Sequence, residues 1–95
     1  MEERWTRGVS GMFLVIISHL PRDYNFYCSH QNRLKDVLKI LRLKEDNVEL
    51  LIFKHYEDAD DATYDFDNME VWDEQYNTFQ RINLRCVSLC MKVEE

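Results

Sequence analysis

The hydrophobic positions of the chain fall into short runs that predict strands. Residues 12–19 (MFLVIISH) are β-branched or aromatic with both faces apolar, which predicts a central strand covered on both sides. Residues 24–28 (YNFYC) follow a turn that holds the only proline, and they predict a second strand in a hairpin with the first. Residues 48–56 (VELLIFKHY) and 81–93 (RINLRCVSLCMKV) predict two further strands.

The pattern changes to a helical period between the second and third predicted strands. Leu34, Val37, Leu38 and Leu41 follow the spacing i, i+3, i+4, i+7, which places them on one stripe of a helix. The sequence therefore predicts one main helix over residues 29–44.

The segment from residue 57 to residue 74 (EDADDATYDFDNMEVWDE) carries nine carboxylates and neither Lys nor Arg. Such a density of like charge is unfavourable unless the segment is solvated, bound to a cation or facing a basic partner. Apolar residues such as Phe66 and Trp72 are interspersed, so we expect an ordered acidic surface. A loop with a short helix or strand near residues 69–72 is the predicted structure.

The element order predicts a small α+β domain with a mixed sheet. We expect the two long terminal strands to pair in parallel at the centre, with the helix covering one face. One helix covers only one face, so the other would expose an apolar patch, for which Val87 and Leu89 are candidate residues. The alternative is that the N-terminal arm or Phe66 and Trp72 fold over this face.

This order, together with Leu51, Ile52 and Phe53 at the third predicted strand, resembles the β-grasp fold of ubiquitin-like proteins. Residues 13–19 are also similar to the start of elongin B, a member of that superfamily. The resemblance implies a β-grasp-like mixed sheet of four to five strands, with residues 1–11 as a flexible arm and residues 12–95 as a single ubiquitin-like domain. The chain has no terminal Gly-Gly, so conjugation is not implied.

Within that superfamily, the acidic segment resembles the acidic motif of PB1 domains, which follows the third strand. No Gly stands at the tight turn of the motif, and the first predicted strand has no Lys, which a PB1 domain with a basic face would carry there. The resemblance implies an acidic face that docks a basic partner. The residues that would form this face are Glu57, Asp58, Asp60, Asp61, Asp65 and Asp67.

Composition narrows the partners further. The net charge is −6, whereas a generic nucleic-acid binder is basic, so we expect no direct nucleic-acid contact. No apolar run approaches the roughly 18 residues of a membrane helix, so we expect no membrane partner. The three cysteines are an odd count without a paired framework, which predicts reduced thiols and a cytoplasmic or nuclear location. A basic stretch over residues 22–44 forms an opposite pole and a second, weaker docking face, which leaves a hetero- or homo-oligomer open. Its candidate residues are Arg22, Arg33, Lys39 and Arg42.

Site chemistry gives little support for an enzyme or a cofactor. The spacing from Asp58 fails the EF-hand pattern, because Thr63 and Met69 stand where that pattern needs Gly and Glu. Cys28 and His30 alone do not make a zinc motif, and the three cysteines read as reduced core thiols. We therefore predict no catalytic residue, no metal and no cofactor.

The sequence thus predicts a non-catalytic protein-interaction module that docks a basic partner through its acidic segment. A second hypothesis is a viral or phage inhibitor that imitates nucleic-acid phosphates to block a nuclease or a DNA-binding regulator. Dense carboxylates with interspersed aromatics favour this second hypothesis, and the basic stretch disfavours it.

Overall fold

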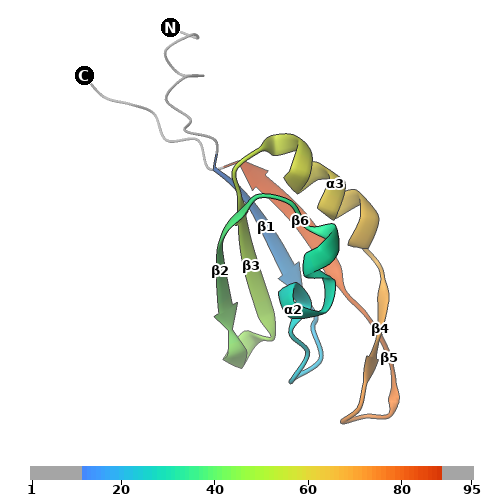
Figure 1. Cartoon of the computed structure of the whole chain (residues 1–95). Coiled ribbons are helices and arrows are strands. Elements are labelled where there is room, and N and C mark those ends of the chain that lie inside the picture. Colours follow the sequence, from blue (N-terminus) through green and yellow to red (C-terminus); the bar gives the residue numbers. More distant parts are fainter. Residues whose placement is uncertain (1–11, 89–95) are drawn as a thin grey trace, which may run out of the picture.

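A four-stranded antiparallel sheet forms the centre of the computed structural model, which describes residues 12–88 (Figure 1). The strand order is β2 (Val37–Leu43), β3 (Val48–Phe53), β1 (Phe13–Ser18) and β6 (Asn83–Ser88). Helices α2 (Phe26–His30) and α3 (Tyr56–Phe66) lie on the same face of this sheet. Short 3-10 turns η1 (Gln31–Arg33) and η2 (Lys44–Asp46) flank β2, and strands β4 (Glu70–Asp73) and β5 (Thr78–Arg81) form a separate hairpin.

The α+β class is confirmed, and so are the strands predicted over residues 12–19 and 48–56. β1 is central, since it pairs with β3 on one side and β6 on the other. The expected parallel pairing of the terminal strands is wrong, because β1 and β6 are antiparallel and the sheet is not mixed. β5 and β6 occupy the first part of the last predicted strand, and residues 89–93 lie outside the described residues.

The main helix predicted over residues 29–44 is wrong, because most of that segment forms η1 and β2. Asp36 adopts a left-handed φ of 53°, a conformation that interrupts a right-handed helix. After it, Leu41 and Leu43 alternate with Arg42 in a strand. The register of β2 shifts between Val37 and Lys39, so the alternation is regular only in its second half and the apolar residues before it have helical spacing.

The short strand predicted over residues 24–28 is also wrong, because that segment leads into helix α2. The Asn25 side chain caps the helix by accepting a hydrogen bond from the Cys28 N–H at 3.0 Å. Phe26, which follows the cap, is fully buried in the core. A single polar cap thus sets the local structure over the strand propensity of the aromatic residues around it.

The acidic segment begins with an ordered helix where a loop was predicted. Ala59, Ala62 and Phe66 are buried at the spacing i, i+3, i+7, and they form the inner stripe of α3. Glu57 and Asp58 lie in the first turn, where the positive end of the helix dipole stabilises carboxylates. Near residues 69–72, where a short helix or strand was expected, the chain forms strand β4.

The hydrophobic core lies between the sheet and the two helices. It holds alternate side chains of β1, β3 and β6 together with the inner stripes of α2 and α3. Within residues 12–88, no helix has the length and apolar character needed to cross a bilayer. The core members on the four-stranded sheet are Val15, Ile17, Leu51, Phe53 and Leu84, and β4 adds Val71.

Candidate docking site on the open sheet face

The face of the four-stranded sheet opposite the helices is a candidate docking site. Successive strand residues point to opposite faces, so the neighbours of the core residues point away from the helices. Among residues 12–88, no helix or further sheet layer lies against this face. Its apolar members, which we call the open face, are Leu14, Ile16, Leu41, Leu43, Val48, Leu50, Ile52 and Val87.

The open face is ordered in cross-strand rows. One row runs Lys39, Ile52, Leu14, Val87 across β2, β3, β1 and β6. The next row runs Leu41, Leu50, Ile16, Arg85 across the same strands. Aliphatic side chains therefore occupy the middle of both rows, and a cation stands at one end of each, at opposite edges of the sheet.

Exposure is greatest along the β2 side of this face. The side chains of Leu41 and Leu43 are 41% and 44% exposed, which is high for leucine. Val87, predicted to lie on the apolar face, is on the open face, and its binding role stays a prediction. Leu89 lies outside the described residues.

The basic residues predicted to form one docking face are divided by the fold. Only Lys39 is on the open face. Arg33 lies 3.9 Å from Asp65 and 4.7 Å from the centroid of the Phe66 ring, so it packs over α3. Arg42 points to the covered face, where its guanidinium contacts a buried carboxylate.

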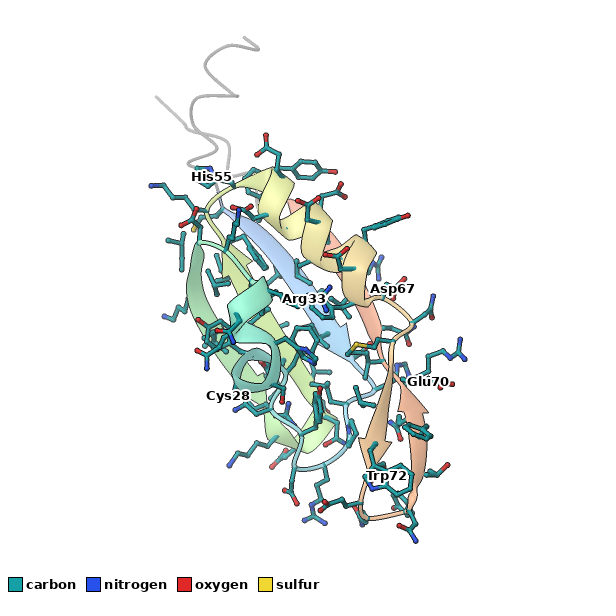
Figure 2. The ribbon with its side chains drawn as sticks, turned by 45° about the vertical axis from the view of Figure 1, so that its right-hand side comes forward. Cys28, Arg33, His55, Asp67, Glu70 and Trp72 are labelled. Carbon is teal, nitrogen blue, oxygen red and sulfur yellow. The ribbon has the colours of Figure 1, made fainter. Side chains whose placement is uncertain are left out.

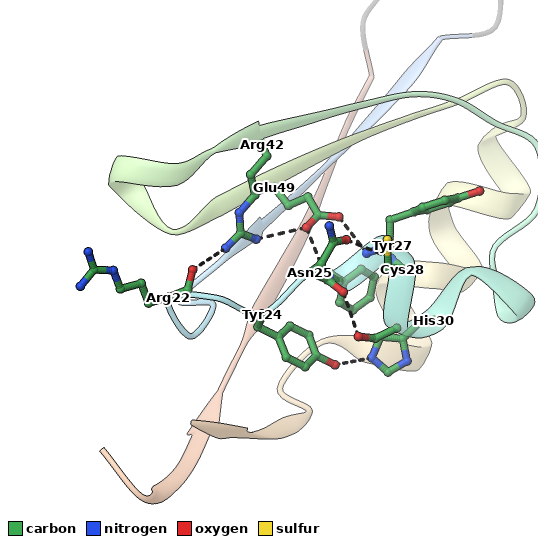
Figure 3. A network of polar contacts seen from close by, with 10 residues as sticks. Arg22, Tyr24, Asn25, Tyr27, Cys28, His30, Arg42 and Glu49 are labelled. Carbon is green, nitrogen blue, oxygen red and sulfur yellow. Dashed lines mark hydrogen bonds and ion pairs between the residues drawn. The ribbon is translucent and has the colours of Figure 1, made fainter. Parts of the chain in front are cut away.

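That carboxylate belongs to Glu49, which is 1% exposed and organises the covered face (Figure 3). It accepts hydrogen bonds from the Phe26 and Tyr27 N–H groups at 3.0 and 2.8 Å, and from Arg42 Nη1 at 3.1 Å. Arg42 also donates to the Arg22 carbonyl at 3.2 Å. Glu49 thus joins α2 to β2 and β3, and nothing in the alternating pattern of its strand signalled this role.

The predicted acidic residues fall into three groups, and Figure 2 labels Asp67, which follows the end of α3. Asp67 is structural, because its carboxylate accepts the Leu84 N–H at 2.8 Å and so joins the end of α3 to β6. Asp58 is half-buried in the first turn of α3. The other four form the exposed outer face of α3, which is on the helix side of the molecule: Glu57, Asp60, Asp61 and Asp65.

One further cluster has metal-ligand chemistry. Single ligand atoms of Asp36, His55 and Asp58 all lie within 4.8 Å of one another, and the His55–Asp36 ion pair measures 3.7 Å. Asp36 and His55 are exposed, and the same geometry serves a surface ion pair that needs no metal. The cluster was missed in the sequence because its members come from separate segments.

Titratable groups with shifted pKa values lie on the covered side. Burial, helped by Arg33, lowers the pKa of His30, whose Nε2 is 2.6 Å from the Tyr24 hydroxyl. Burial also raises the pKa of the Cys86 thiol, which disfavours the reactive thiolate. Cys28 is exposed, so its assignment to the core is wrong.

The sheet order, with two helices on one face and a β4–β5 hairpin before the last strand, defines the class of fold. The chain is similar to the RRM domain of S. pombe Puf1, with a TM-score of 0.62 and 19% identity over 81% of this chain and 96% of that one. No protein-family model and no curated protein matches the chain. At this identity the likeness establishes the fold and not the ligand.

This likeness corrects two predictions. The β-grasp, ubiquitin-like and PB1-like resemblance is wrong, because the sheet and its helices are arranged as in an RRM domain. The prediction of no direct nucleic-acid contact is also withdrawn. RRM domains recognise RNA through their sheet, so net charge alone does not remove that class of partner from a chain with this fold.

The open face nevertheless differs from the RNA platform of RRM domains. In that platform, aromatic side chains on the two central strands stack on bases. Here the outward residues of the central strands are aliphatic except Ser18, and Phe13 and Phe53 point into the core. Among residues 12–88, the exposed aromatic pair Trp72 and Phe79 is on the β4–β5 hairpin, with ring centroids 5.1 Å apart.

Proposed function

We propose that the chain is a non-catalytic protein-interaction module that docks a protein segment on its open face. The observation that carries the proposal is that aliphatic side chains stand where an RNA platform has aromatic ones, across the centre of a sheet face that no element within residues 12–88 covers. Aliphatic side chains supply apolar area that is removed from water on binding, but they have no π-face on which a base could stack.

The size and continuity of the aliphatic rows support the same function. Isolated exposed leucines are normal on protein surfaces, whereas contiguous apolar patches mark interaction sites. Leu14 pairs directly with Ile52, and Ile16 pairs directly with Leu50. Leu41 and Leu43 extend the patch to the β2 edge. Full burial of an exposed Leu or Ile side chain contributes about 1.5–3 kcal/mol. Leu41 and Leu43 are already more than half covered, so each contributes a fraction of this and the whole patch is needed for a specific complex.

A site-specific photo-crosslinker tests this function. We would place p-benzoylphenylalanine at position 50 on the open face, and at position 64 as a matched control, since Tyr64 is 86% exposed on α3. Irradiation in cells of the source organism should give a protein adduct from position 50. The same adduct should be lost when Leu41→Glu and Leu43→Glu are added to the open face, while circular dichroism remains unchanged.

Three outcomes overturn the proposal. An adduct that nuclease digestion removes would assign the open face to a nucleic acid. No adduct from position 50 would show that the face has no partner in the cell. An equal protein adduct from both positions that survives the glutamate substitutions would show non-specific labelling.

A further inference from the structure

The charges that border the open face define the chemistry of its partner. The outward side chains of its strands include two cations, Lys39 and Arg85, and no carboxylate within the described residues. The one acidic residue of these strands, Glu49, points to the covered face and is buried. A partner on this face therefore meets an aliphatic surface with positive charge at both edges.

We propose that the occupant of the open face is an amphipathic helix of another protein, with an aliphatic stripe flanked on both sides by carboxylates. This inference rests on the proposed function and specifies the partner. The aliphatic stripe would lie over Leu14, Ile16, Leu50 and Ile52, and the flanking carboxylates would face Lys39 and Arg85. Charge complementarity of this kind fixes the register of a partner more than it adds affinity.

The spacing of the two cations fits a helix. Lys39 and Arg85 are on the two edge strands, three strand intervals apart, which corresponds to about 14 Å at the usual spacing. A helix with its side chains is about 10–12 Å wide, so one helix lying along the strands fits between them. The cations are in neighbouring rows, which are offset along the strands by the length of two strand residues. The two carboxylates that they contact would be offset by the same length along the axis of the partner helix.

A second copy of the chain fits this face less well. If two open faces met about a two-fold axis, four cations would come together with no carboxylate to pair with them. Helix α3 of another copy supplies carboxylates, but its exposed apolar residues are Tyr56 and Tyr64, not an aliphatic stripe. Among residues 12–88, no surface supplies both an aliphatic stripe and acidic flanks, so we assign both to a different protein.

Binding of two matched peptides to the full chain tests the partner chemistry. Both are labelled helical peptides with leucines at i, i+3, i+4 and i+7, and they differ only in whether Glu or Lys flanks the leucines. Binding to the open face is the part that Leu41→Glu and Leu43→Glu abolish. In that part we expect the Glu peptide to bind about tenfold more tightly than the Lys peptide at low salt, which corresponds to two partly exposed charge pairs. The double variant Lys39→Glu, Arg85→Glu should reverse the preference, and Lys35→Glu, Lys54→Glu should leave it unchanged.

The possible outcomes distinguish failure of the acidic-flanked helix as partner from failure of the proposed docking function. Equal binding of both peptides, lost on Leu41→Glu and Leu43→Glu, would overturn the acidic-flank assignment and leave the docking function intact. Failure of both peptides to bind would overturn the helical partner. If a single-stranded RNA oligonucleotide bound instead and the same glutamate substitutions abolished it, the proposed function would fall as well.

Discussion

The two faces of the four-stranded sheet share the same strands but differ in what covers them. On the covered face, aromatic and aliphatic residues pack under α2 and α3. The one buried charge on its strands, Glu49, accepts hydrogen bonds from the first N–H groups of α2 and from Arg42. On the open face, side chains are aliphatic with a cation at each edge, and no described element lies over them. The difference indicates that the covered face determines stability, whereas the open face is available for binding.

The largest expected effect comes from removing the buried carboxylate of the covered face. Glu49→Ala leaves Arg42 and the first N–H groups of α2 without their partner. The loss of one member of a buried ion pair costs about 3–5 kcal/mol of unfolding free energy. Urea unfolding measures it, with Glu45→Ala as the control, because Glu45 is exposed in η2 and should change stability by less than about 0.5 kcal/mol. Similar small losses in both variants would contradict the role of Glu49.

A second prediction separates the two kinds of carboxylate in the acidic segment. Asp67→Ala removes the acceptor of the Leu84 N–H and should cost about 1–3 kcal/mol of unfolding free energy. Asp60→Asn and Asp61→Asn remove exposed charge from the outer face of α3 and should change stability by about 0.5 kcal/mol or less. Thermal or urea unfolding of the three variants checks this. A destabilisation by Asp60→Asn as large as that by Asp67→Ala would show that the outer carboxylates are also structural.

These contrasts explain which features the sequence could predict. β1 and β3 were predictable because runs such as Leu50–Phe53 are apolar on both faces, and the open apolar face followed from having helices on one side only. β2 was mistaken for a helix because its first apolar residues have helical spacing, and a register shift between Val37 and Lys39 hides the alternation of the strand. The left-handed backbone at Asp36 ends any helix before β2. The Glu49 network joins residues more than 20 positions apart, so no local pattern contains it.

The sequence of α3 contains a helical pattern that the interpretation of the acidic segment as a loop did not use. Ala59, Ala62 and Phe66 have helical spacing, yet the density of carboxylates favoured a loop. The carboxylates are tolerated because the inner stripe is apolar and the outer face is solvated. The sequence did not predict the relative direction of β1 and β6. Two apolar strands can pair parallel or antiparallel, and the elements between them determine which pairing forms.

A third prediction concerns the binding role of the outer face of α3, which stays a prediction. A labelled lysine-rich peptide should bind the chain at low salt and be released as the salt concentration rises. Asp60→Lys with Asp61→Lys should raise its dissociation constant about tenfold, which corresponds to about 1.4 kcal/mol. The matched control is Asp23→Lys with Asp46→Lys, which alters two exposed carboxylates away from α3. An equal loss of binding in both double variants would show that only net charge matters.

The smallest expected effect is a pH dependence that belongs to the covered face. The His30 ring packs against Phe26 and Phe66 at centroid distances of 4.7 and 4.9 Å, and burial with the nearby Arg33 lowers its pKa. The unfolded chain has a histidine pKa near 6.5, and the folded His30 has a lower one. Above pH 6.5 the imidazole is neutral in both states and the shift does not change stability. As the pH falls through and below 6.5, the unfolded chain binds the proton more readily, so the folded state is destabilised. Unfolding free energy should therefore decrease between pH 7 and pH 5, and His30→Gln should reduce this slope. His19→Gln, which alters no described core contact, should keep the slope, and an unchanged slope in His30→Gln would refute the assignment.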